Sequence, residues 1–293
     1  MRRGRFSGFA APCLARLEPV NRRLAGVIAL LSVVGLLIAS ASAAQFGFGR
    51  GRQKVRYVPD GSYSGSFLFC RISFRNSPYG DGGGWSVDYP RADLNLSFRL
   101  SELTKTPISR DPSGQIRHIL IRLTDPELYK CPFIMMTEPG GLFVDPQEAA
   151  ALRDYLLKGG FLWADDFWGT RAWVNWSGEI AKALPPSTYP IVEVPFEHEL
   201  FHMLYDVREM PQIPSIGFWF GTRGATSERG ADSAVPHARA ILDDHRRIMV
   251  LMTYNTDFGD AFERETDDRE YFLEFAPRGY AFGVNALVYA MTH

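Results

Sequence analysis

The chain lacks several features that mark particular classes of protein. Its 293 residues include only 3 Cys and carry a formal net charge of -1. A nucleic-acid-binding protein carries a basic excess and a disordered protein has few apolar residues, whereas 46% of this chain is hydrophobic. The composition therefore predicts a globular protein with a sizeable core, and we expect no nucleic-acid partner.

Motifs of the common hydrolases are also missing. The sequence contains no Gly-x-Cys-x-Gly or Gly-x-Ser-x-Gly elbow, which would expose a Cys or Ser nucleophile at a sharp strand-to-helix turn. A glycine-rich loop spans 80–84 but lacks the Lys-Ser/Thr of a phosphate-binding loop. Thiol or serine hydrolysis and nucleotide binding are therefore not expected, and the loop is either a lid or a simple connection.

The few cysteines carry little information. Cys13 belongs to the amino-terminal segment, which leaves Cys70 in an apolar run and Cys131 before a proline. We expect both to be buried free thiols. A disulfide between Cys70 and Cys131 is the alternative, and it requires an oxidising compartment and a short distance between their Cα atoms.

The first 44 residues differ from all that follow. Several arginines precede an uncharged run from Leu24 to Ala44, and residues 41–43 are the small residues that a signal peptidase recognises. We predict that 1–44 is a signal peptide, with an uncleaved transmembrane helix that anchors the chain in the membrane as the alternative. Either one places the rest of the chain across the cytoplasmic membrane, in the periplasm or attached to the membrane.

The remainder divides into a linker and one folded domain. Residues 45–66 are rich in Gly, Arg and Ser without periodicity, so we predict a flexible linker. Residues 67–293 show no internal repeat and no second core, so they form one predicted domain. Its apolar runs predict strands at 67–74, 118–123, 132–136, 161–164 and 191–194, and a hairpin of 240–242 with 248–252.

Helix signals alternate with these strands. Helices are predicted at 88–103, 146–158, 176–184 and 278–293. The second is the best marked, because Asp145 is a capping residue, Pro146 follows it, and Gly159 with Gly160 ends the helix just before a buried strand. Helices that alternate with buried strands predict an α/β domain with a parallel, doubly wound sheet.

Four stretches of this domain resemble a known family. They are residues 152–160, 161–169, 254–263, and a closing stretch made of 283–285 with 289–293. Together they resemble the bacterial family called domain of unknown function 4159, over about 67–293. The resemblance implies a three-layer sandwich with a mostly parallel, flavodoxin-like doubly wound sheet, similar to the class I glutamine amidotransferase-like superfamily. It implies no established activity.

One motif matches a zinc site literally. His198 and His202 have the spacing of H-E-x-x-H, in which two His one helical turn apart bind zinc. The motif needs a stable helix, but Pro195 lies just upstream, and the family usually has His-Pro where this chain has Glu199. We favour a loop and a short helix whose His residues orient a strand end, with a zinc peptidase as the alternative.

Acidic side chains follow two of the predicted strands. Asp165 and Asp166 end one strand, and Asn255, Asp257 and Asp260 follow another. Ligands of doubly wound sheets bind beyond the carboxyl ends of the strands, so these ends are expected to converge. Such oxygen-rich groups suit a hard divalent cation, a sugar or a cationic group, and crowded carboxylates suit acid–base chemistry.

A structural role for these acids is the alternative, which we slightly favour. They would cap helices, bind loop N–H groups or pair with arginines such as Arg75 and Arg171. Aromatic residues crowd the same strand end, where they either line a cleft or pack in the core. These residues are Trp163, Phe167, Trp168, Trp173 and Trp176.

Two functions remain open. The first is a non-catalytic domain that binds a small molecule or an envelope protein outside the cytoplasm. The second is a metal- or carboxylate-dependent hydrolase that acts on envelope carbohydrate or peptide, with a divalent cation as the possible cofactor. The candidate ligand-binding residues are Asp165, Asp166, Trp168, His198, Asn255, Asp257 and Asp260. The weak metal candidates are Asp165, Asp166, His198, His202 and Asp257.

Overall fold

A computed structural model of the chain describes residues 65–293. The predicted signal peptide or anchor at 1–44 lies outside the described residues, and so does the predicted linker at 45–66 except for its last two residues. Within the described part, no helix is long and apolar enough to span a membrane.

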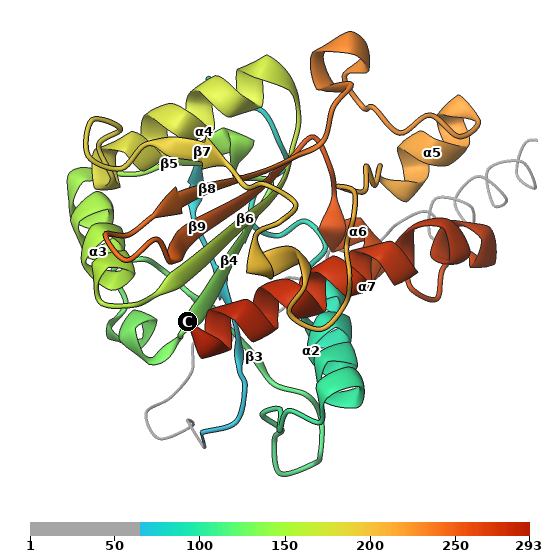
Figure 1. The fold of residues 1–293 in the computed structure, drawn as a ribbon, viewed down its shortest axis with the longest axis horizontal. Coiled ribbons are helices and arrows are strands. Elements are labelled where there is room, and N and C mark those ends of the chain that lie inside the picture. Colours follow the sequence, from blue (N-terminus) through green and yellow to red (C-terminus); the bar gives the residue numbers. More distant parts are fainter. Residues whose placement is uncertain (1–64) are drawn as a thin grey trace, which may run out of the picture. The chain divides into compact units, whose positions relative to one another are not determined.

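The domain is built on a mostly parallel sheet of seven strands (Figure 1). In spatial order these strands are β3 (His118–Ile121), β1 (Phe69–Ile72), β4 (Phe133–Thr137), β6 (Phe161–Phe167), β9 (Ile248–Tyr254), β8 (His237–Leu242) and β7 (Ile191–Glu193). The first five are parallel, and β8 and β7 add an antiparallel edge. A separate small sheet pairs β2 (Arg75–Asn76) with β5 (Leu142–Phe143).

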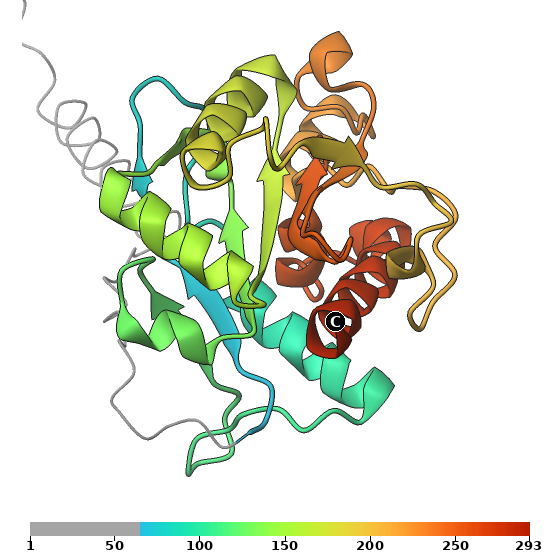
Figure 2. The same ribbon diagram turned by 60° about the vertical axis from the view of Figure 1, so that its left-hand side comes forward.

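Helices cover both faces of the large sheet (Figures 1 and 2). In the described part the α-helices are α2 (Arg91–Thr104), α3 (Pro146–Leu157), α4 (Gly169–Ala183), α5 (Ile216–Thr222), α6 (Phe258–Glu263) and α7 (Arg269–Thr292), of which α5 lies away from the sheet in Figure 1. Buried residues of α2, α6 and α7 belong to one hydrophobic cluster, and those of α3 and α4 belong to another.

Strand β4 shows why the sheet is buried on both sides. Phe133 and Met135 belong to the cluster with α2 and α7, whereas Ile134 and Met136 belong to the cluster with α3 and α4. Successive side chains of a strand point to opposite faces, so a continuous apolar run needs cover on both. The apolar runs of the sequence therefore located the strands of the large sheet, although several of their bounds differ.

The capping signals of α3 are confirmed. The Asp145 carboxylate accepts hydrogen bonds from the N–H groups of Gln147 and Glu148, and the Glu148 carboxylate accepts one from the Asp145 N–H. Gly159 has a φ of 102°, a conformation that side chains disfavour and that ends the helix before β6. The predicted hairpin is also present, since β8 and β9 pair antiparallel.

Two predicted boundaries near the end of β6 are wrong. The strand does not stop at Asp165 but continues through Phe167, with an irregular register after Ala164. Helix α4 begins at Gly169 rather than at Trp176. Its first N–H groups are bound by side chains distant in sequence, which no local pattern reveals: the Gly169 N–H donates to Asn255 Oδ1 at 2.9 Å.

The last helix also begins earlier than predicted. Helix α7 starts at Arg269 instead of Arg278, and it continues through Pro277. A proline inside a helix removes one hydrogen bond and normally predicts a break. Here the first turns are held by the Asp268 cap, which accepts a hydrogen bond from the Tyr271 N–H, and by burial of Tyr271 and Phe275.

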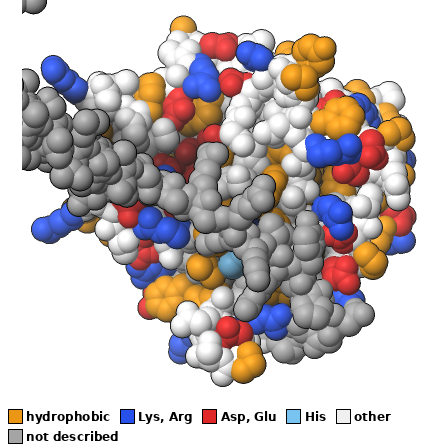
Figure 3. Space-filling view, turned by 180° about the vertical axis from the view of Figure 1, so that it is seen from behind, with side chains coloured by type: hydrophobic (Ala, Val, Ile, Leu, Met, Phe, Trp, Pro, Cys, Tyr) orange, Lys and Arg blue, Asp and Glu red, His pale blue; other side chains and the backbone are white. Residues whose placement is uncertain are grey.

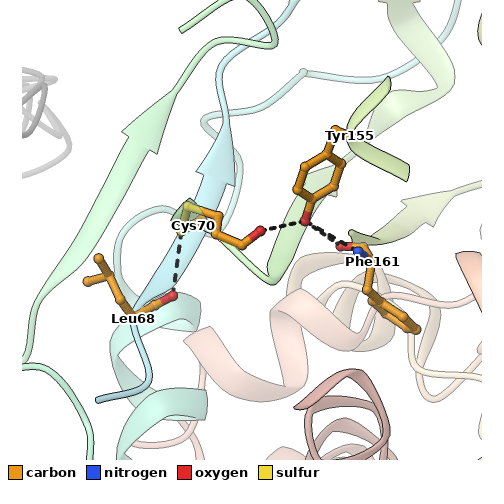
Figure 4. Close-up of a disulfide and its surroundings, with 5 residues drawn as sticks. Leu68, Cys70, Tyr155 and Phe161 are labelled. Carbon is orange, nitrogen blue, oxygen red and sulfur yellow. Dashed lines mark hydrogen bonds between the residues drawn. A yellow bond between two sulfur atoms is a disulfide. The ribbon is translucent and has the colours of Figure 1, made fainter. Parts of the chain in front are cut away.

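The expectation of two free thiols is wrong. Cys70 and Cys131 form a disulfide with an S–S distance of 2.02 Å and a Cα–Cα distance of 6.2 Å (Figure 4). Cys70 lies on β1, and Cys131 comes just before the neighbouring strand β4. The Tyr155 hydroxyl donates a 2.7 Å hydrogen bond to the Cys131 carbonyl and fixes this segment. Strand order, which the sequence does not reveal, brings the two cysteines together.

Candidate functional site

Four left-handed residues mark the carboxyl edge of the central strands. They are Asp88 (φ 59°), Glu138 (φ 48°), Asp166 (φ 60°) and Asn255 (φ 61°). Asp88 lies in the connection from β1 to α2, and the others end or directly follow β4, β6 and β9. Non-glycine residues are uncommon in this strained region, and they concentrate at functional sites. Every one of the four carries side-chain oxygen.

Three carboxylates meet at this edge. Asp88, Asp166 and Asp257 each offer one oxygen, and the three oxygens lie within 4.8 Å of one another. We call these three residues the acidic trio. Its members are 5%, 4% and 3% exposed in that order. A spacing below 5 Å is what oxygens around one Ca²⁺ show, because each lies 2.3–2.6 Å from the ion.

Asp88 contributes an oxygen that the protein leaves unpaired. Its Oδ2 is buried and accepts no hydrogen bond. The backbone makes room for this atom at Gly259, where a Cβ would overlap Asp88 Oδ2 and would lie 3.3 Å from Asp257 Oδ1. A buried, unpaired carboxylate oxygen is costly, so its presence needs an explanation such as an ion or a bound proton.

The pKa values of the trio agree with an ion or a bound proton at Asp88. Burial raises the pKa of Asp88 well above the ordinary value, and the charge of Asp260 raises it further. Burial likewise raises the pKa of Asp166 and of Asp257, which also repel each other. The raised pKa values mean that the crowded trio favours either bound protons or a cation that replaces them.

Arg71 holds the segment that carries Asp88. Its guanidinium is fully buried on β1 and forms an ion pair with Asp93 of α2. It also donates to the carbonyls of Trp85 and Val87, at 3.3 and 3.2 Å. These bonds fix the backbone just before Asp88, so the position of the carboxylate is built into the fold.

A second acidic group adjoins the trio. Asp88, Asp260 and Glu263 also bring three carboxylate oxygens within 4.8 Å of one another. Unlike the trio, this group is paired with a positively charged side chain. Arg264 donates from Nε to Asp260 Oδ1 at 3.1 Å, and its Nη2 lies 2.7 Å from Glu263 Oε2. The two groups share Asp88 but differ in how their charge is balanced.

Comparison with known proteins identifies the family. The sequence model described as domain of unknown function (DUF4159) matches residues 73–291. The chain belongs to the DUF4159 family. The match covers nearly the whole described domain, including every residue of the acidic trio. No curated protein matches the chain.

In the DUF4159 domain, three of the predicted site residues form hydrogen bonds with other groups of the protein. Asp165 accepts hydrogen bonds from the Thr253 hydroxyl and from the Gly259 N–H. Asn255 accepts from the Gly169 N–H and donates to a carbonyl, and Asp260 accepts from the Ile216 N–H and from Arg264. The structural alternative therefore describes these three residues correctly.

Two other predicted residues keep capacity for a ligand. Asp257 Oδ1 accepts the Asp260 N–H at 2.7 Å as the cap of α6, and Asp166 Oδ1 accepts from Trp168 Nε1 at 2.8 Å. Each of these bonds uses only one of the two carboxylate oxygens. Trp168 itself is buried and orients Asp166 through this bond.

The arginines proposed as partners of these acids pair elsewhere. Arg75 binds Asp145 and Glu148 at the start of α3. Arg171 donates to the Tyr79 carbonyl in the glycine-rich connection. Neither arginine neutralises the acids at the carboxyl edge, so these two named partners are wrong, whereas Asp260 does pair with another arginine, Arg264.

The aromatic residues pack in the core rather than lining an open cleft. Trp163 is fully buried and contacts the rings of Phe258, Phe262 and Phe282. Trp176 is fully buried on the opposite face of the sheet, in the cluster with α3 and α4. Their bulk stabilises the two faces, so it gives no evidence for a sugar site.

The His198 and His202 pair lacks the helical geometry of an H-E-x-x-H zinc motif. The segment between them, Glu199–Phe201, is a single 3-10 turn and not an α-helix, which confirms the short-helix interpretation. His202 Nε2 lies 2.7 Å from the Phe196 carbonyl, and its Nδ1 lies 3.0 Å from Asp206. Both ring nitrogens are therefore used.

His198 also lies far from the acidic trio. Its ring is 5.7 Å from that of Tyr289, whose hydroxyl accepts a hydrogen bond from the N–H of Ile248, the first residue of β9. Asp257 follows the other end of that strand, about 20 Å away for seven residues at the usual rise. His198 is therefore too far away to assist these carboxylates, which leaves a metal as the assistant that the hydrolase hypothesis allows.

Glu138 ties the glycine-rich connection to the site. Its carboxylate accepts hydrogen bonds from the N–H groups of Gly83 and Gly84. The Asp81 N–H donates to the Gly140 carbonyl at 3.0 Å in the same contact. Burial is the main cause that raises the pKa of Glu138 to about 7. The connection is thus bound to the turn after β4.

Sequence reasoning missed Asp88 and Glu138. Asp88 precedes Pro90 and was assigned to the start of a helix, and its backbone carbonyl does accept the N–H of Ala92 in the first turn of α2. Glu138 lies in a Glu-Pro-Gly-Gly turn without any pattern of its own. Only their positions in the chain could have indicated them. Asp88 and Glu138 follow predicted strands that a doubly wound sheet places beside Asp166.

Proposed function

We propose that this exported domain is a non-catalytic ligand-binding domain, and that its ligand at the acidic trio is one hard divalent cation such as Ca²⁺, Mg²⁺ or Mn²⁺. The buried Asp88 carboxylate carries the proposal, because its Oδ2 is unpaired and one of its oxygens lies within 4.8 Å of two further carboxylates that no arginine or lysine of the described chain neutralises. Carboxylates are the ligands of hard cations.

Binding rather than hydrolysis fits the surroundings of the trio. A hydrolytic metal centre must admit the substrate to the ion, but the three ligands are each at most 5% exposed. The cysteines cannot serve as nucleophiles while they are joined in the disulfide. A hydrolase remains the second candidate, favoured only by the position of the trio beyond the carboxyl ends of the strands.

The disulfide supports export. Disulfides persist in oxidising compartments such as the periplasm and are rare in the cytosol. Cys70 and Cys131 are joined, which agrees with the proposed signal peptide or membrane anchor at 1–44. Figure 3 shows basic and acidic side chains intermixed on the described surface in view, which agrees with a partner other than nucleic acid.

We also propose a flavodoxin-like, three-layer fold related to the class I glutamine amidotransferase-like superfamily. The spatial order of the five parallel strands supports it, because β3-β1-β4-β6-β9 is the order 2-1-3-4-5 of that class. In such a sheet the order reverses between β1 and β4, and Asp88 and Glu138 follow these two strands. The candidate site thus lies where this class binds ligands.

Metal analysis of the full chain tests the proposed function. We expect one Ca²⁺ or Mn²⁺ per chain after dialysis, and a higher Tm when the ion is added to chelator-treated protein. At 100 times Kd the ion would add about 2.7 kcal/mol, or about 5–10 °C for a domain of this size. Absence of both binding and the Tm shift would overturn the cation proposal.

Two pairs of variants make this test specific. Asp257→Asn keeps the cap of α6 but removes a ligand charge, so it should abolish the cation-induced shift, whereas Asp154→Asn on exposed α3 should not change it. Gly259→Ala should displace Asp88 Oδ2 and weaken binding without removing any charge. Gly178→Ala in α4 is its control, since no atom lies within 4 Å of the added Cβ.

A further inference from the structure

We propose that Arg264 limits this centre to a single cation by serving as the permanent counter-ion of the second acidic group. The inference rests on the proposed function, because it concerns the stoichiometry of the same site. It assigns Arg264 a role in cation specificity, although Arg264 is not a ligand.

The two groups would otherwise form a binuclear centre. They share Asp88, and each brings three carboxylate oxygens within 4.8 Å. One bridging carboxylate between two ions is the arrangement of two-metal sites, in which the ions lie about 3.5–4 Å apart. The ligand set of the second position would be Asp88, Asp260 and Glu263.

Arg264 already places a positive charge at that second position, 2.7 Å from Glu263 Oε2, which is itself buried and accepts no hydrogen bond. Besides its contacts with Asp260 and Glu263, its Nη1 lies 3.3 Å from Asp267. A guanidinium stays charged at every physiological pH and its planar fork fits several carboxylates at once. A second divalent ion would have to displace this group or bear its repulsion, so the position is closed to it.

The trio has no equivalent group. Arg71 is fully buried, but it donates to Asp93, to the Thr137 hydroxyl and to backbone carbonyls. Within the described chain, Arg71 forms no ion pair with Asp88. Its positive charge lowers the pKa of Asp88 from a distance. The difference between the groups therefore predicts one open cation position and one closed position.

Substitution of Arg264 tests this inference. We expect one Mn²⁺ per wild-type chain in equilibrium dialysis, with the paramagnetic resonance spectrum of an isolated ion. Arg264→Gln should bind two Mn²⁺ and show a spin-coupled spectrum, because the ions would share Asp88. Arg264→Lys retains the charge and should bind one. Arg91→Gln removes a neighbouring arginine that pairs with Asp267 and should also bind one.

Each outcome separates the two proposals. Two Mn²⁺ in the wild type, or one in a folded Arg264→Gln variant, would overturn the role of Arg264 and leave the cation site standing. No Mn²⁺ in the wild type would overturn the cation site itself, and the inference with it. Should Arg264→Gln fail to fold, Arg264→Met, which keeps the packing of the side-chain stem, provides the same stoichiometric comparison.

Discussion

Titration of Asp165 gives a quantitative prediction about stability. Burial raises the pKa of Asp165 to about 7 from an ordinary value of 3.8, against the opposing effect of its hydrogen bonds. A shift of about three units corresponds to about 4 kcal/mol of differential interaction between the two protonation states. The folded chain therefore holds this proton more tightly than the unfolded chain does.

The sign of the effect follows from linkage. Below about pH 4 both states are protonated at Asp165, and the stabilising contribution is fully present. As the pH rises from about 4 to 7, only the unfolded state loses the proton readily, so the free energy of unfolding falls by up to about 1.4 kcal/mol per pH unit. Asp165→Asn removes the titrating group and should flatten this decline.

Urea denaturation in chelator at pH 4.5, 5.5, 6.5 and 7.5 measures the prediction. We expect the difference in unfolding free energy between wild type and Asp165→Asn to change by about 3–4 kcal/mol across this range, in favour of the variant at high pH. Burial lowers the pKa values of His118 and His198, so these two residues make the folded state more stable as the pH rises. The wild type and the variant both contain them, so their contributions cancel in that difference.

The control is a carboxylate with the opposite shift. Hydrogen bonds from Lys158 and Tyr129 lower the pKa of exposed Asp154, so its contribution is lost only when the pH falls below the unfolded value near 4. The Asp154→Asn variant should therefore run parallel to the wild type between pH 5.5 and 7.5. If Asp165→Asn also ran parallel to the wild type, the reasoning about its buried carboxyl would be refuted.

Three further predictions concern the fold. Replacing Cys70 and Cys131 by Ala opens a loop with a sequence separation of 61 and should cost about 4 kcal/mol of unfolding free energy in urea denaturation. Arg71→Met leaves Asp93 as an uncompensated buried charge and should cost about 3–5 kcal/mol in the same assay, and a loss below 1 kcal/mol would contradict the buried ion pair. Asp145→Ala removes the cap of α3 and should lower the unfolding free energy by about 1 kcal/mol.

Local patterns predicted those elements whose signals are local. The apolar runs located the strands because each run needs burial on both faces of the sheet. The capping box of α3 lies within four residues, Asp145 to Glu148, so its hydrogen bonds could be anticipated from the sequence alone. The start of α4 could not be anticipated, because its first N–H group donates to Asn255, which lies 86 residues away.

The candidate site was only half predictable for the same reason. Asp166 and Asp257 each adjoin a recognisable strand, and their convergence follows from a general rule about parallel sheets. The sequence does not show which of these carboxylates are left without enough hydrogen-bond donors or cationic partners. Asp165 and Asp260 have the same chemistry as Asp166, but the fold surrounds them with donors such as the Gly259 N–H and Arg264.

The sequence by itself determined the α/β class, the capped helix α3, the apolar strands and family membership, because each depends on residues close together in the chain or on the pattern as a whole. Only the tertiary structure decided that Cys70 bonds to Cys131 and that Asp88 joins Asp166 and Asp257. The physical reason is that strand order and the balance of donors around each carboxylate arise from contacts between distant segments, which no local spacing encodes.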